Sequence, residues 1–85
     1  MIGFTVYTKS KERFYCDKYF DLEVQVEVFI ENILKQKTVK LITFDNKCVI
    51  LIVDDISNFV IDTKENIEKS INSIRALSDL YSGKY

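Results

Sequence analysis

The chain has 85 residues, with 12 Lys and Arg against 13 Asp and Glu and a hydrophobic fraction of 47%, which indicates one small globular domain with a formal net charge of −1. It contains no histidine and only two glycines, so an imidazole base, a Cys/His zinc site and a glycine-rich phosphate loop are excluded. We therefore expect no catalytic residues, no metal and no bound cofactor.

The near-zero charge argues against a general polyanion binder, although it leaves room for a local basic strip. The longest apolar stretch, 48–53, is far too short to cross a bilayer, and the first residues lack the pattern of a secretory signal. Cys16 and Cys48 are too few for a disulfide framework and are expected to be reduced thiols that pack as small hydrophobes. We expect a cytoplasmic chain with no membrane contact.

The first predicted element is a β-hairpin across residues 2–17. Apolar side chains alternate with others along residues 2–7, which is the period of a half-buried strand. Residues 9–12 are polar and turn-like, and aromatic strand formers resume at residue 13.

Residues 21–36 fit two templates. Alternating apolar side chains over 22–30 are typical of a strand, whereas a longer stripe of apolar side chains follows the helical period and continues past residue 30. We predict a helix over about 22–36, with Asp21 as its N-cap. A strand over 22–30 remains the alternative.

The next two segments, 39–44 and 48–53, are separated by Asp45, Asn46 and Lys47, and Asp and Asn tolerate the left-handed backbone of a tight turn. They are predicted to pair as antiparallel strands. Because 48–53 is apolar at every position, it is expected to be a central strand covered on both faces, or one covered by a helix and a partner.

A short strand is predicted over 58–61, and a helix follows from residue 62, where apolar residues recur at steps of three and four. The predicted fold is therefore α+β: a single compact domain over residues 1–85, with two helices on a small, mainly antiparallel sheet in the order β-β-α-β-β-(β)-α.

A first candidate surface is the N-terminal hairpin, where cations alternate with aromatic rings. Bases could stack on the rings while the cations hold phosphates, as in single-strand binders. The same residues also suit a protein-contact surface, or an edge on which lysines discourage strand pairing. The residues are Tyr7, Lys9, Lys11, Arg13, Tyr15, Lys18 and Tyr19.

A second candidate surface is acidic. In a helix, Glu23, Glu27 and Glu31 stand at successive i+4 steps and form an acidic ridge that could dock on a basic groove of another protein. A solvated helix face explains them equally well. Asp54 and Asp55 are predicted to be further partner-binding residues of this acidic kind. Because they are adjacent, their side chains would point to opposite faces of a strand, so they are not expected to form a cation site.

A third candidate surface is the apolar end of the last helix, where Leu77, Leu80 and Tyr81 could form a dimer face. Simple core packing is the competing explanation.

From these features we expect a small non-enzymatic regulator or inhibitor that occupies a surface on a larger protein, with a homodimer as a further option. The Lys-, Asn- and Ile-rich composition suggests a viral or mobile-element accessory protein, such as an anti-defence protein. The alternative is a nucleic-acid-binding module that uses the N-terminal hairpin.

Overall fold

A computed structural model describes residues 1–81, with side chains described as far as Ala76. The order of elements matches the predicted α+β arrangement. The elements are β1 (Ile2–Thr8), β2 (Arg13–Tyr15), α1 (Glu23–Leu34), β3 (Thr38–Ile42), β4 (Cys48–Ile52), the short 3-10 helix η1 (Val53–Asp55), β5 (Ile56–Thr63) and α2 (Lys64–Tyr81).

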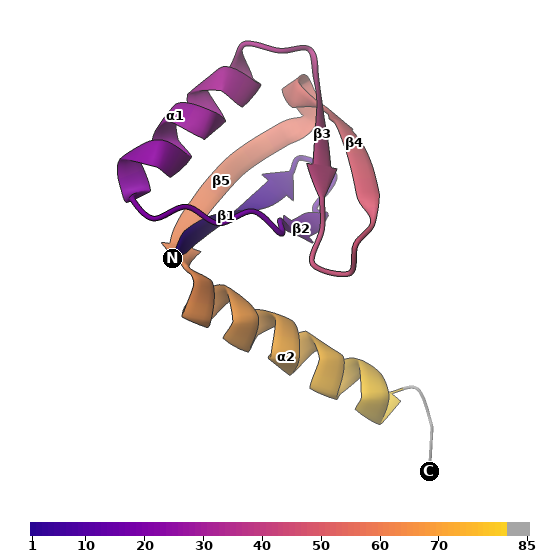
Figure 1. The fold of residues 1–85 in the computed structure, drawn as a ribbon. Coiled ribbons are helices and arrows are strands. Elements are labelled where there is room, and N and C mark those ends of the chain that lie inside the picture. The colour runs from indigo at the N-terminus through magenta and orange to yellow at the C-terminus, as the bar shows by residue number, and fades with distance from the viewer. Residues whose placement is uncertain (82–85) are drawn as a thin grey trace.

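The strands form two antiparallel sheets, of order β2-β1-β5 and β3-β4. A bridge between Cys16 and Thr43 joins them, supported by a hydrogen bond of 2.9 Å from the Asp17 N–H to the Ile42 carbonyl. In the view of Figure 1, β1 and β5 run between α1 and the β3–β4 hairpin, and α2 leaves from the end of β5 beside the N-terminus.

The main core lies between α1 and the strands. Phe4 and Val6 point to one face of β1 and are fully buried against Val26 of α1 and Phe59 of β5. Val39, Leu41 and Leu51 close the core from the β3–β4 hairpin. Alternation along β1 therefore sends its large apolar side chains to the α1 side of the sheet.

A smaller cluster lies on the opposite face of β1. There Ile67 and Ile71 of α2 pack on Tyr15, with Tyr19 and Phe44 at the margin. Gly3 permits the close approach, because a Cβ at this position would lie only 2.8 Å from two ring carbons of Tyr19. Each helix thus covers a different face of the three-stranded sheet.

The helix predicted over 22–36 is confirmed, but its start differs from the prediction. The N-cap is Leu22, not Asp21, and the Gln25 Oε1 accepts hydrogen bonds from the N–H groups of Asp21 and Leu22. A side chain from inside the helix therefore satisfies the preceding backbone, so an acidic N-cap is not needed.

The predicted central position of the apolar strand is wrong. β4 pairs only with β3 and lies at the edge of its sheet, with Ile50 70% and Ile52 63% exposed. The predicted short strand at 58–61 is in fact the eight-residue β5, which pairs with β1 at every position except Ser57.

Candidate functional site: a basic and aromatic groove

The candidate site begins with the register of the N-terminal hairpin. Tyr7 pairs with Arg13 and Thr5 pairs with Tyr15, so these four side chains share the face of the sheet that points away from α1. Asn58 is the partner of Tyr7 on β5, and the pairing then skips Ser57, as in a β-bulge. Bulges commonly redirect a side chain beside a binding site.

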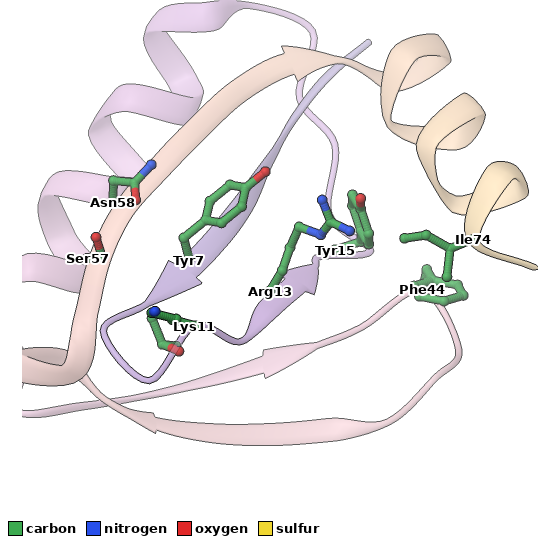
Figure 2. A pocket seen from close by; sticks show the side chains of 9 residues that line it. Tyr7, Lys11, Arg13, Tyr15, Phe44, Ser57, Asn58 and Ile74 are labelled. Carbon is green, nitrogen blue, oxygen red and sulfur yellow. The ribbon is translucent and has the colours of Figure 1, made fainter. Parts of the chain in front are cut away.

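An open groove of about 690 Å³ lies on this face. Figure 2 shows Tyr7, Arg13 and Tyr15 in a row, from the turn that carries Lys11 to Phe44 and Ile74. We name it the hairpin groove; it is lined by Tyr7, Thr8, Lys11, Arg13, Tyr15, Phe44, Ser57, Asn58 and Ile74.

The groove exists because α2 covers only part of the sheet face. Ile67 and Ile71 bury Tyr15 to 7% exposure, but Tyr7 remains half-buried and Arg13 is exposed. One end of the groove is closed by Phe44 from the β3–β4 turn and by Ile74 from α2.

The groove carries positive charge. Among the described side chains, its lining includes Lys11 and Arg13 and no acidic residue. The Arg13 guanidinium lies 5.2 Å from the centre of the Tyr15 ring, and Arg75 lies 5.2 Å from that of Phe44. These are cation–π distances, so the rings help to orient the cations.

The turn at the open end of the groove is held rigidly. Lys11 has a φ of 68°, in the left-handed region. The Thr8 hydroxyl accepts from the Glu12 N–H at 3.0 Å, and the Ser10 hydroxyl donates to Asp55 at 3.2 Å. The Lys9 N–H also donates to the Asp55 carbonyl at 2.7 Å. Asp55, predicted as a partner-binding residue, therefore anchors this turn to η1.

The structure gathers four of the seven predicted hairpin residues into the groove: Tyr7, Lys11, Arg13 and Tyr15. Lys9 is held at the turn, and the Lys18 Nζ lies 5.2 Å from the centre of the Phe29 ring of α1. Neither lines the groove.

Tyr19 lies in a separate hollow of about 250 Å³ beside Arg75 and Asn72. Burial raises the pKa of Tyr19, and the nearby Asp17 carboxylate raises it further. Lys64 lies 5.1 Å from the centre of its ring.

The acidic ridge is present on α1, where Glu23, Glu27 and Glu31 are all exposed. It is separate from the hairpin groove, because α1 covers the other face of the sheet. Asp54 is exposed on η1, and no described pocket brings it together with the ridge. The side chains of Leu77, Leu80 and Tyr81 lie outside the described residues.

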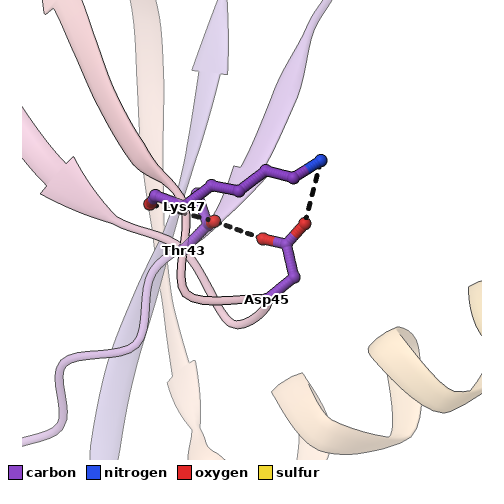
Figure 3. Close-up of polar contacts among 3 residues, drawn as sticks. All are labelled: Thr43, Asp45 and Lys47. Atoms are coloured by element: carbon purple, nitrogen blue, oxygen red, sulfur yellow. Dashed lines mark hydrogen bonds and ion pairs between the residues drawn. The ribbon is translucent and has the colours of Figure 1, made fainter.

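Sequence reasoning missed five groove residues: Thr8, Phe44, Ser57, Asn58 and Ile74. Phe44 is positioned by the turn shown in Figure 3, where the Thr43 hydroxyl donates to Asp45 and the Lys47 Nζ pairs with the same carboxylate at 3.5 Å. The hydrogen bond from Thr43 is the main cause of the lowered pKa of Asp45, and Lys47 adds to it. Thr43, Asp45 and Lys47 stand at every second position, and this spacing was the feature of the sequence that indicated an ordered turn.

The two thiols differ in environment. Cys16 is buried, and burial raises its pKa to about 12, so it stays protonated at neutral pH. Cys48 is exposed on β4. Within residues 1–81, no group of three or more metal-ligating side chains converges and no helix is long and apolar enough to span a bilayer.

The arrangement is an open groove on one face of a small α+β fold rather than an enclosed cavity. No family model, curated protein or solved structure matches the chain.

Proposed function

We propose that this chain is a non-enzymatic binding protein that occupies a surface on a larger protein, and that the hairpin groove is its contact surface. One observation carries the proposal: Tyr7, Arg13 and Phe44 converge on the part of the sheet that α2 leaves open. Tyrosine and arginine are the residue types that most often dominate binding energy at protein interfaces, and phenylalanine is enriched there.

The chemistry of the groove points to an acidic segment of the partner. Lys11 and Arg13 face the groove, and the side chains described up to residue 76 place no carboxylate in its lining. A partner carboxylate could accept two parallel hydrogen bonds from the Arg13 guanidinium, while Ser57 and Asn58 offer further polar contacts. The half-buried Tyr7 and Phe44 would pack on an apolar part of the same segment.

The test is recovery of the partner from the native cells with a tagged chain, comparing the wild type with Arg13→Glu. Lys37→Glu is the matched control, since Lys37 is exposed between α1 and β3 and does not line the groove. We expect the wild type and Lys37→Glu to retain one protein in near-equal amounts, and Arg13→Glu to retain at least about tenfold less, equivalent to about 1.4 kcal/mol. Equal retention by all three chains contradicts the proposal.

A second candidate function is binding of single-stranded nucleic acid, favoured by the alternation of Lys11 and Arg13 with rings. Tyr15 is too buried to stack with a base, which leaves Tyr7 and Phe44 as platforms. Fluorescence anisotropy with a labelled oligothymidine at low salt separates the two functions. Salt-sensitive binding that Arg13→Glu removes and Lys37→Glu preserves would favour nucleic acid over a protein partner.

A further inference from the structure

The outer edge of β4 is an exposed strand edge that lies apart from the hairpin groove. Two hydrogen bonds show which residue pairs of the β3–β4 ladder are hydrogen-bonded. The Thr43 N–H donates to the Lys47 carbonyl, and the Val53 N–H donates to the Lys37 carbonyl, both at 2.9 Å. Hydrogen-bonded pairs alternate with non-bonded pairs in an antiparallel ladder. Val49 and Leu51 therefore bond to β3, whereas Cys48, Ile50 and Ile52 direct their N–H and C=O groups away from it.

Most of these outward backbone groups have no partner within residues 1–81. The exception is the carbonyl of Ile52, the N-cap of η1, which accepts the first hydrogen bond of that short helix. No described strand pairs with β4 on its outer side, and the described hydrogen bonds outside helices and strands involve neither Cys48 nor Ile50. Figure 1 shows β4 on the outside of the fold, with β3 as its neighbour. The same three residues carry the exposed side chains of the strand, with Ile50 70% and Ile52 63% exposed.

The β4 edge lacks the usual protection against strand pairing. Edge strands are commonly blocked by lysines, prolines or bulges, but β4 has the sequence Cys-Val-Ile-Leu-Ile and pairs without a bulge. β4 itself carries no charged residue, and Lys40, opposite Ile50, lies one strand away on β3. No like charges would therefore meet if two copies of β4 paired.

We propose that this edge is the interface of a homodimer, in which two β4 strands pair antiparallel about a two-fold axis at Ile50. Ile50 then faces Ile50 of the second copy, and Cys48 faces Ile52 of the second copy. A second copy suits this edge because antiparallel pairing is self-complementary: the two Ile50 residues exchange two hydrogen bonds, and each Ile52 N–H meets the Cys48 carbonyl of the other copy. The two hairpins become one four-stranded sheet.

The dimer accounts for the position of the most apolar strand in the chain. In the paired sheet β4 becomes a central strand, as its composition predicts. The exposed isoleucines then have cross-strand neighbours at about 4.5–5.5 Å between Cβ atoms, which partly shields them from water.

The first test is the mass in solution, measured by light scattering across a concentration series. We expect the wild type to reach twice its 10.0 kDa monomer mass. Ile50→Lys places two like charges at the two-fold axis and should leave a monomer. Val28→Lys on α1, where Val28 is 51% exposed, is the matched control and should remain a dimer. Circular dichroism checks that both variants are folded.

The second test fixes the register. Ile52→Cys should form a disulfide with Cys48 of the second copy in a glutathione buffer, because hydrogen-bonded antiparallel pairs have Cα atoms about 5.5 Å apart. Within one chain, four residues of strand separate these positions by about 13 Å, so no internal bridge can form. Ile42→Cys is the control, since Ile42 lies opposite Cys48 in the same chain and should give an internal bridge.

Three results would each overturn the homodimer: a wild type that stays monomeric at every concentration, an Ile50→Lys variant that still dimerises, or an Ile52→Cys variant without a covalent dimer while Ile42→Cys forms its internal bridge. A strand from a different protein found on β4 in place of a second copy would also overturn it.

Discussion

The two faces of the β2-β1-β5 sheet are made by the same strands but differ in completeness. On the α1 side, Phe4 and Val6 are fully buried in a core that also receives side chains from β3, β4 and β5. On the other side, α2 covers Gly3 and Tyr15 but leaves Tyr7 and Arg13 open. Stability is therefore expected to depend mainly on the first face, and recognition on the uncovered part of the second.

The largest expected effect tests this division within one strand. Phe4→Ala removes a ring whose centre lies 5.7 Å from that of Phe29 and 6.0 Å from that of Phe59. It should lower the free energy of unfolding by about 3–5 kcal/mol. Tyr7→Ala, on the open face, should lower it by about 1 kcal/mol and reduce partner binding. Urea unfolding followed by circular dichroism measures both; similar losses would remove the distinction between the faces.

The next effect concerns the contact between α2 and the sheet. Gly3→Ala introduces a methyl group 2.8 Å from the Tyr19 ring and 3.1 Å from the Ile67 side chain. We expect a loss of about 1–3 kcal/mol from overpacking. In a Tyr19→Leu background the same change should cost less, because the ring is gone. An equal cost in both backgrounds, measured by urea unfolding, would show that the Tyr19 ring is not the cause.

A smaller effect is expected at the start of α2. The Thr63 hydroxyl caps this helix by accepting from the Asn66 N–H at 3.2 Å. Thr63→Ala should cost about 1 kcal/mol, and Thr63→Ser should recover most of it. Thermal unfolding of the three chains provides the comparison. If Ala and Ser behave alike, the hydroxyl does not stabilise the helix that covers the second face.

The smallest effect is on the turn that carries Phe44. Thr43→Val removes the hydrogen bond that lowers the pKa of Asp45, so this pKa should rise toward its ordinary value. Because the folded pKa is lowered, the interaction stabilises the fold above the unfolded pKa and is lost as pH falls through the folded pKa. An NMR titration of the Asp45 carboxyl carbon measures the shift. Lys47→Gln should raise the pKa less; the reverse order would contradict the assigned causes.

Local patterns predicted the fold well because they reflect which side of each element is buried. Alternation placed Phe4 and Val6 on one face of β1, and the helical stripe of α1 distinguished it from a strand by continuing to Ile33. The Asp45–Asn46 turn was predicted from its chemistry, and Asn46 has the expected positive φ of 62°. These features depend on neighbours in the sequence.

The candidate site was only half predictable because it depends on how distant segments meet. Tyr7 and Arg13 share a face through their own hairpin, so the N-terminal residues indicated them. Asn58 reaches the groove through pairing of β5 with β1, and Ile74 through the path of α2. The position of β4 was mispredicted for a related reason: composition shows that a strand is apolar, but not which chain covers it.

Phe44 has a consequence that extends beyond the hairpin groove. Its ring lines that groove, the hollow beside Tyr19 and Arg75, and a third hollow of about 230 Å³ bordered by Asp45 and Lys47. One side chain thus forms a wall common to three depressions. A ligand that displaces this ring from one depression alters the shape of the other two. Binding in one depression would therefore change the affinity of its neighbours, even though the two ligands make no direct contact.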